Sequence, residues 1–285
     1  MRWRAGRRSD NVEDRRGMRV SRRGIAGGGV GTVVIVLVAL YFGVDPAVIL
    51  EGMPPGGTTQ STGGHYQPSP REQELADFSS VILADTEDTW HEIFRRSGEQ
   101  YREPGLVLFS GAVQSACGMT GSAVGPFYCP PDQKVYIDLS FFEDLASRFR
   151  APGDFAQAYV IAHEVGHHVQ TLLGISNKVR ALQRSATSKE ANAIQVRMEL
   201  QADCFAGVWA NNANRARHIL EQGDVEEGLT AASAIGDDRI QKQTRGRVVP
   251  DAFTHGSSAQ RVRWFKRGLQ SGNPNQCDTF NASDL

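Results

Sequence analysis

Apolar side chains recur at steps of three and four after Asp154, which is the spacing of one face of an α-helix. Asp154 is a suitable N-cap for this helix, and Gly174 is a suitable stop signal. The pattern therefore predicts a core helix between these two residues. The apolar positions on its face are Phe155, Ala158, Ala162, Val165, Val169 and Leu172.

Further helical patterns occupy much of the chain after residue 70, with two strand-like runs between them. The runs "LVLFSG" (106–111) and "KVYIDL" (134–139) are typical of strands. A capping box formed by Thr187 and Glu190 opens one of the helices. These elements predict an α+β fold that is mostly helical with a small sheet. The other predicted helices cover residues 71–97, 188–212, 224–242 and 257–269.

Residues 24–44 read "GIAGGGVGTVVIVLVALYFGV" and contain no charged side chain. As a helix, these 21 residues would span roughly 30 Å, about the hydrocarbon thickness of a bilayer. The run is longer than the apolar part of a signal peptide, and no small-residue cleavage site follows it. It therefore predicts one N-terminal transmembrane helix. The alternative is a helix buried in the protein core.

The distribution of charge sets the expected orientation of this helix. Residues 1–23 contain nine arginines and three acids, which give a net charge of +6. Because the whole chain has a net charge of −1, the remaining residues carry a net charge of −7. Positive residues stay on the cytoplasmic side of membrane helices. We therefore expect a single-pass bacterial cell-membrane protein, with residues 1–23 as a basic cytoplasmic arm, residues 24–44 in the lipid bilayer and residues 71–285 as an extracytoplasmic domain. Residues 45–70, rich in Pro, Gly, Ser and Thr, are expected to form a flexible linker.

Four cysteines follow the apolar run, and none of them shows the C-x-x-C spacing of a structural zinc site. Cys117 and Cys129 close a short loop and form a plausible disulfide, which leaves Cys204 with Cys277. Three pairings are open to four cysteines. The alternative is that some of them are buried thiols, above all Cys204.

The segment "AHEVGHHVQ" (162–170) places three of the seven histidines in the predicted core helix. His163 and His167 are four residues apart and share one face, so both imidazoles can bind one Zn²⁺. Glu164 borders that face and is placed to accept a proton from a water at the metal, as in H-E-x-x-H metallopeptidases. His168 is rotated by about 100° from His167, and we assign it to the helix flank, as a support for the site or an interface residue. The alternative is that this short pattern arose by accident.

A catalytic zinc ion usually has three protein ligands and one open position. The segment "MELQADCF" (198–205) supplies Glu199 as the third ligand. Asp203, one turn later, can hydrogen-bond a ligand histidine and fix its orientation. Two acids in such an apolar segment are costly to bury without a role of this kind. The alternative is that both face solvent beside the apolar stripe of the helix.

Five segments carry a resemblance to a known family: "MRW…GRRSDNVEDRRG", "GPFYCPPDQKVYIDLSFF", "AYVIAHEVGHHVQ", "ELQADCFAGVWA" and "THGSSAQRVRWF". They resemble the bacterial predicted neutral zinc metallopeptidases of the YpfJ type and cover most of the chain except the linker. The resemblance implies a zincin-like fold of the gluzincin type with an extracytoplasmic catalytic domain. It also implies zinc ligands at His163, His167 and Glu199, with Glu164 as the catalytic base.

We therefore expect a membrane-anchored zinc metallopeptidase in which Glu164 is the general base. His255, in "THGSSAQR" (254–261), is the candidate donor to the oxyanion of the tetrahedral intermediate; the alternative is that this segment caps the last helix. The sequence leaves open whether Arg261 pairs with an acid in the core or contacts substrate.

The expected partner is a peptide or protein substrate, with "QKVYIDLSF" (133–141) as the sheet edge along which it lies. A net charge of −1 indicates no nucleic-acid partner, and nothing in the sequence indicates an oligomeric state. Two other functions stay open: a binding or scaffold protein with a vestigial or structural metal site, and a zinc hydrolase of a non-peptide substrate. Glu164 argues against the first of these, because a structural metal site has no use for a base.

Overall fold

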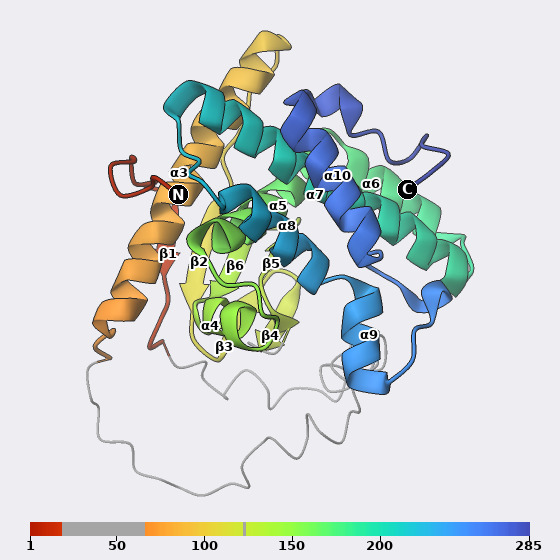
Figure 1. Cartoon of the computed structure of the whole chain (residues 1–285), viewed down its shortest axis with the longest axis horizontal. Coiled ribbons are helices and arrows are strands. Elements are labelled where there is room, and N and C mark those ends of the chain that lie inside the picture. The colour runs from red at the N-terminus through yellow and green to blue at the C-terminus, as the bar shows by residue number, and fades with distance from the viewer. Residues whose placement is uncertain (19–65, 122–123) are drawn as a thin grey trace, which may run out of the picture. The chain divides into compact units, whose positions relative to one another are not determined.

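The histidine segment lies on the central helix of an α+β unit. The computed structural model describes residues 1–18, 66–121 and 124–285, and Figure 1 shows how their elements are arranged. The helices are α3 (Pro70–Arg96), α4 (Ser140–Ser147), α5 (Asp154–Leu172), α6 (Ile175–Arg184), α7 (Ser188–Arg217), α8 (Asp224–Ala234), α9 (Asp237–Arg245) and α10 (Ser258–Ser271), with short 3-10 turns η3 (Pro250–Ala252) and η4 (Pro274–Gln276). The strands are β1 (Val12–Asp14), β2 (Gly105–Phe109), β3 (Ala112–Ser115), β4 (Gly118–Gly121), β5 (Phe127–Cys129) and β6 (Lys134–Asp138). The expected fold, mostly helical with a small sheet, is confirmed.

Four strands form one sheet in the order β1-β2-β6-β5; β1, β2 and β6 are parallel, and β5 runs antiparallel to β6. Leu108 and Ile137 are opposite each other in the β2–β6 register and belong to the main core with the helices. Val107 and Tyr136 belong to a second, smaller core that includes Val113 of the β3–β4 hairpin. Both faces of β2 and β6 are therefore buried, which explains their unbroken apolar runs.

The strand that was expected at the sheet edge lies inside the sheet. β6 pairs with β2 on one side and with β5 on the other. The expectation that residues 133–141 form the edge is therefore wrong, and β5 is the edge strand next to them.

α5 forms where the spacing of apolar residues predicts a core helix, and it packs against α3, α6, α7 and α8. Its N-cap is Gly153 rather than Asp154, which lies in the first turn. Gly153 has a φ of 116°, and a Cβ there would lie 2.0 Å from the carboxyl carbon of Glu227, so the position requires glycine. Gly174 adopts a φ of 72° just after the helix, as expected of a stop signal.

Three other predicted helices are present as α3, α7 and α10, and α7 begins with the predicted capping box. The helix predicted at residues 224–242 is instead two helices, α8 and α9, separated at Gly236. A Cβ at Gly236 would lie 2.5 Å from the backbone nitrogen of Ser258. The chain therefore turns at a glycine because the start of α10 packs directly on it.

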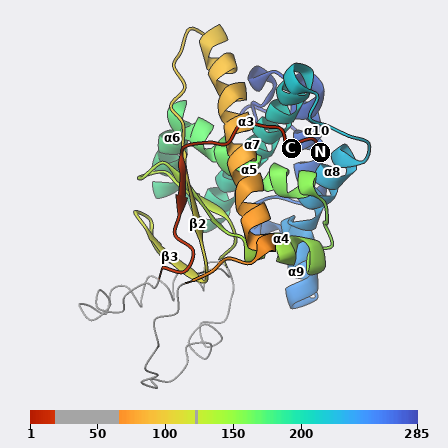
Figure 2. The ribbon, with the colours of Figure 1, turned by 90° about the vertical axis from the view of Figure 1, so that its left-hand side faces the viewer.

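Residues 1–16 pack on the domain. β1 pairs with β2 at the edge of the sheet, and Figure 2 shows the N-terminal segment crossing α3 on its way to β1. Glu87 of α3 is buried and accepts hydrogen bonds from Arg7, Ser9 and Asn11. Two further ion pairs join this segment to α3, Arg4 with Glu74 and Arg8 with Asp77. Three arginines of the expected arm, Arg4, Arg7 and Arg8, are thus neutralised by α3.

This packing contradicts the expected location of the protein. Residues 1–16 and 68–285 form one compact unit, so they cannot lie on opposite sides of a bilayer. The prediction of a single-pass membrane protein with a cytoplasmic arm (1–23) and an extracytoplasmic domain is therefore wrong. Within the described ranges, no helix is both long enough and apolar enough to cross a membrane. The transmembrane helix predicted at residues 24–44 and most of the predicted linker (45–70) lie outside those ranges.

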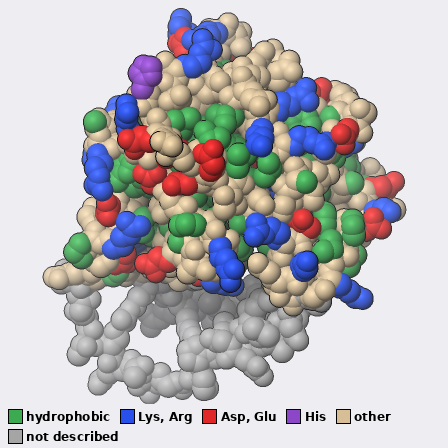
Figure 3. Space-filling view, viewed as in Figure 1, with side chains coloured by type: hydrophobic (Ala, Val, Ile, Leu, Met, Phe, Trp, Pro, Cys, Tyr) green, Lys and Arg blue, Asp and Glu red, His purple; other side chains and the backbone are tan. Residues whose placement is uncertain are grey.

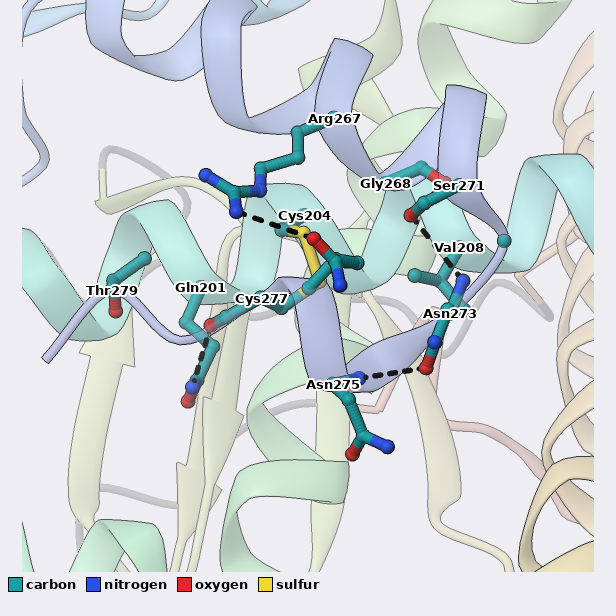
Figure 4. The surroundings of a disulfide bond; sticks show 12 residues. Gln201, Cys204, Val208, Arg267, Gly268, Ser271, Asn273, Asn275, Cys277 and Thr279 are labelled. Carbon is teal, nitrogen blue, oxygen red and sulfur yellow. Dashed lines mark hydrogen bonds between the residues drawn. A yellow bond between two sulfur atoms is a disulfide. The ribbon is translucent and has the colours of Figure 1, made fainter. Parts of the chain in front are cut away.

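Both expected cysteine pairs are disulfides in the structure. Cys117–Cys129 joins the β3–β4 turn to the edge strand β5. Cys204–Cys277 joins α7 to the segment that follows α10, as Figure 4 shows. All four cysteines are therefore used, and the alternative of buried thiols is excluded.

Candidate metal centre

Three side chains from α5 and α7 converge on one point. One ligand atom each of His163, His167 and Glu199 lies within 4.8 Å of the other two. Glu199 Oε2 is 3.2 Å from His163 Nε2 and 3.4 Å from His167 Nε2. Two imidazole nitrogens and one carboxylate oxygen are a ligand set that zinc accepts, so these three residues could hold a metal ion.

Gly166, the glycine inside the motif, allows α5 and α7 to approach this closely. A Cβ at Gly166 would lie 3.0 Å from the carbonyl oxygen of Ala202 and 3.1 Å from its Cα. Any larger residue would push the helices apart, because the nearest atoms belong to the backbone of α7. Glu199 and Asp203, one turn apart, lie on either side of Ala202 in the sequence of α7. Local sequence thus sets the helix spacing that brings Glu199 to the two imidazoles.

Hydrogen bonds on the outer side of each of these three side chains fix its orientation. Asp203 accepts a hydrogen bond from His163 Nδ1 at 2.8 Å, as its predicted role requires. Gln170 Oε1 accepts one from His167 Nδ1 at 2.9 Å. Gln195 Nε2 donates to Glu199 Oε1 at 2.7 Å, which leaves Oε2 for the centre. Both imidazoles therefore present an unprotonated Nε2 to the shared point when they are neutral, as metal binding requires.

The electrostatics of the site favour charged carboxylates. Burial raises the pKa of Asp203, but the adjacent Arg261 guanidinium outweighs it and holds that pKa at about 2. Burial likewise raises the pKa of Glu199, and the imidazole of His167 outweighs it, so the pKa lies well below its usual range. Burial lowers the pKa of His163, but the charge of Asp203 outweighs it and raises that pKa to about 9. A metal ion binding here would therefore release a proton from His163 at neutral pH.

Glu164 lies beside the first imidazole and has a free carboxylate. Its side chain is buried with 8% of the residue exposed, and no hydrogen bond joins it to another described residue. Its oxygens are not among the buried polar atoms that lack a partner, so solvent reaches them. A carboxylate in this position can exchange a proton with a water at the centre.

His168 points away from the centre and supports the surrounding structure. It is fully buried; its Nε2 donates to the carbonyl oxygen of Arg102 at 2.6 Å, and its Nδ1 is 3.0 Å from the hydroxyl of Tyr128 on β5. Nδ1 therefore accepts from Tyr128. Burial lowers the pKa of His168 to about 4, so its ring is neutral at pH 7. His168 thus ties the edge strand to α5.

His255 lies in the loop between α9 and α10. Its side chain is 40% exposed, and its Nδ1 is 3.0 Å from Thr254 Oγ1 and 3.4 Å from Asp237 Oδ1. Asp237 Oδ2 also accepts hydrogen bonds from the backbone nitrogens of residues 254, 255 and 256, at 2.6 to 3.0 Å. His255 interacts electrostatically with Glu199. The loop therefore holds a partly exposed imidazole near the three converging residues.

Several supporting residues were not predicted from the sequence. Gln170 follows His167 by three positions, and helical spacing could have identified it. Tyr159 precedes His163 by four positions, and its hydroxyl donates to Asp203. Gln195 precedes Glu199 by four positions on α7, so the same spacing could have identified it. Asp237 lies on α9, and no local pattern connects it with the site.

The chain is similar in sequence to one described protein family and to several bacterial proteins. The family described as "Putative neutral zinc metallopeptidase" matches residues 1–280. The "Uncharacterized protein YpfJ" of Escherichia coli K12 is 54% identical over 294 aligned positions, which cover 99% of this chain and 100% of the relative. The "Uncharacterized protein Rv2575" of Mycobacterium tuberculosis H37Rv is 41% identical over 258 positions, covering 87% of this chain and 86% of the relative. No solved structure matches the chain.

Proposed function

Because the chain belongs to this family of neutral zinc metallopeptidases, we propose that it is a peptidase that hydrolyses peptide bonds at a zinc site formed by His163, His167 and Glu199. The observation that carries the proposal is the convergence of these three ligand atoms within 4.8 Å. Glu164 is the residue next to His163, and its carboxylate interacts electrostatically with His167. The order of the ligands along the chain, H-E-x-x-H followed by a glutamate on a later helix, is that of a gluzincin-type zincin.

Zinc bound here would polarise the peptide carbonyl and lower the pKa of a water molecule at its open position. Glu164 then accepts the proton of the attacking water and delivers it to the nitrogen of the leaving amine. Asp203 holds the ring of His163, and Gln170 holds the ring of His167, so neither imidazole has to reorient during the reaction.

We assign the oxyanion of the tetrahedral intermediate to His255. Its imidazole is partly exposed and is positioned by Asp237 and Thr254. The same imidazole interacts electrostatically with Glu199. A donor that is already in place stabilises developing negative charge without reorganisation. The hydrogen bonds that Asp237 accepts from three successive backbone N–H groups support the loop that presents this donor.

An extended peptide substrate would lie along β5. This strand ends the described sheet, so one side of its backbone is available for a further strand. Tyr128 of β5 is joined to His168 of α5, which keeps the strand next to the helix that carries the zinc ligands. β5 packs against α5, so a peptide paired with β5 would run beside the helix that carries His163 and His167.

The full chain loaded with zinc is incubated with a proteome-derived peptide library, and the products are identified by mass spectrometry. The wild type is expected to cleave peptides, and Glu164→Gln is expected to bind zinc as well as the wild type does but to cleave at least about 10²-fold more slowly, because a general base contributes roughly 10²- to 10⁴-fold. Glu143→Gln, the same chemical change at an exposed position of α4, is the matched control. Cleavage by Glu164→Gln at the wild-type rate would reject the proposed role of Glu164.

A further inference from the structure

Arg261 of α10 is a buried cation that the proposed reaction does not use. It is 2% exposed, and its partner Asp203 is fully buried. Its Nε donates to Asp203 Oδ2 and its Nη2 to Asp203 Oδ1, both at 2.8 Å. Burying a charged pair is costly, and the cost is recovered only with good geometry and further hydrogen bonds. The fork of two parallel hydrogen bonds supplies that geometry and fixes the plane of the carboxylate.

The carboxylate that Arg261 holds also orients a metal ligand. Asp203 Oδ1 accepts hydrogen bonds from Arg261, from His163 Nδ1 at 2.8 Å, and from the hydroxyl of Tyr159. Arg261 Nη2 in turn donates to the Tyr159 hydroxyl at 3.1 Å. Each member contacts at least two others, so a rotation of Asp203 would break several hydrogen bonds at once.

We propose that Arg261 is a positioning residue for the metal centre: it fixes Asp203, and through Asp203 it fixes the ring of His163. Arg261 Nη2 lies only 3.4 Å from His163 Nδ1, yet both nitrogens are donors when Nδ1 is bonded to Asp203, so Arg261 acts on the ring through the carboxylate. Without the fork, Asp203 could rotate about its side chain, and His163 Nε2 would lose its fixed direction.

The packing of α10 on α7 explains how Arg261 reaches this position. A Cβ at Gly268 would lie 1.9 Å from the carbonyl oxygen of Cys204, and a Cβ at Gly207 would lie 2.2 Å from that of Phe265. The two helices therefore meet backbone to backbone, two turns beyond Arg261. The Cys204–Cys277 disulfide, drawn in Figure 4, ties the segment after α10 to the residue next to Asp203. α10 and the segment that follows it are thus both fixed to residues 204–208 of α7, which holds Arg261 in place.

A purely structural role makes a different prediction. If Arg261 only joined α10 to α7, its loss would lower the stability of the protein and leave the zinc affinity of the folded molecules unchanged. If it positions His163, the zinc affinity falls even where the protein is fully folded, because second partners of metal ligands typically contribute 10- to 100-fold to metal affinity. Zinc affinity measured below the unfolding transition therefore separates the two roles.

The inference rests on the proposed zinc site, and the experiment measures zinc binding apart from peptide cleavage. The full-length wild type, Arg261→Met and Arg261→Lys are compared by zinc competition with a chromophoric chelator and by the visible spectrum of the cobalt(II)-loaded proteins. Circular dichroism establishes that each variant is folded. Arg263→Met, two residues further along α10 and half exposed, is the matched control.

We expect Arg261→Met to bind zinc 10- to 100-fold more weakly and to shift the cobalt bands, and Arg263→Met to match the wild type. Arg261→Lys keeps the positive charge but cannot form the two parallel hydrogen bonds, so its zinc affinity should lie between that of Arg261→Met and that of the wild type. If Arg261→Met does not fold, the zinc affinity of Arg261→Lys tests the positioning role of Arg261. In an Asp203→Asn background, Arg261→Met should add little further loss, since both act through one carboxylate.

Zinc affinity within twofold of the wild type in the folded Arg261 variants would overturn the inference. So would a loss in the Asp203→Asn background as large as that in the wild-type background. A wild type that binds no zinc would overturn both this inference and the proposed function. A wild type that binds zinc but cleaves no peptide would overturn the proposed function only, and the affinities of the variants would still decide the role of Arg261.

Discussion

His167 and His168 are neighbours in the sequence, but their side chains point in different directions and have different partners. The first presents Nε2 to Glu199, and the second is fully buried between Arg102 and Tyr128. The rotation of about 100° per residue in a helix accounts for this separation. Helical geometry therefore predicted correctly which histidines share a face, but it could not show that the third one joins α5 to a strand.

His168 makes the stability of the protein depend on pH. Its pKa is about 4 in the folded protein and near 6.5 in an unfolded chain. Between these values the unfolded chain binds a proton that the folded protein does not. The contribution of the neutral His168 ring to the free energy of unfolding is therefore complete above pH 6.5 and is lost as the pH falls. The free energy of unfolding decreases for this reason by about 3 kcal/mol at pH 4. Urea unfolding at pH 7 and pH 4 measures this loss.

His168→Gln is the control for this titration, because glutamine can donate and accept in the same positions and carries no charge at either pH. The free energy of unfolding of the wild type should fall by about 3 kcal/mol more between pH 7 and pH 4 than that of the variant. An equal fall in both proteins would mean that His168 does not titrate as its burial requires.

The residues that could be predicted are those whose partners lie within one or two helical turns. His163, Glu164 and His167 follow from spacing alone, and Glu199 with Asp203 follows from the need for a third ligand and for its support. Arg261 completes the site from a position that only the packing of α10 on α7 brings close. No window of sequence contains that information.

At the scale of elements, the contact between α7 and α10 shows why helix boundaries were predicted better than helix packing. Capping boxes mark the starts of both helices in the sequence. Gly207 and Gly268 allow the two helices to touch, but from the sequence alone they are only residues of low helix propensity. Their function is visible only from the atoms of the neighbouring helix.

Gly268→Ala should destabilise the protein by at least about 1–3 kcal/mol, since its methyl group would overlap the carbonyl oxygen of Cys204 and force the helices apart. Gln270→Ala, an exposed change on the same helix, should alter the free energy of unfolding by less than about 0.5 kcal/mol. Urea unfolding of the three proteins at pH 7 provides the comparison. Equal midpoints for wild type and Gly268→Ala would show that α10 can move away from α7 without cost.

At the scale of the whole molecule, composition misled the prediction for the N-terminus. Nine arginines in residues 1–23 indicate a basic arm only if their partners are ignored. The acids that pair with Arg4, Arg7 and Arg8 lie 69 to 80 residues later, on α3. Figure 3 shows acidic and basic side chains interspersed on one face of the molecule. A count of the charges in a short segment cannot predict ion pairs between residues this far apart in the sequence.

Deletion of residues 1–16 should destabilise the domain rather than merely shorten the chain. The sheet loses β1, and the buried carboxylate of Glu87 loses its hydrogen bonds from Arg7, Ser9 and Asn11. The main core also loses the buried side chain of Trp3, a change that typically costs roughly 3–5 kcal/mol. The melting temperature measured by circular dichroism should therefore fall by about 10 °C or more.

Arg4→Met is the matched control, because Arg4 and its partner Glu74 are both exposed, and surface ion pairs contribute about 0–1 kcal/mol. This variant should melt within a few degrees of the wild type. If the deleted protein also melts at the wild-type temperature, residues 1–16 are not part of the folded unit.

The proposed function depends above all on one zinc ion bound by two imidazoles and one carboxylate. Crystals of the zinc-loaded full chain, measured at the zinc absorption edge, test this claim most directly. We predict a single strong anomalous peak about 2.0–2.2 Å from His163 Nε2, His167 Nε2 and a carboxylate oxygen of Glu199. A zinc peak bound by other residues, or the absence of a peak at these three, would contradict the account.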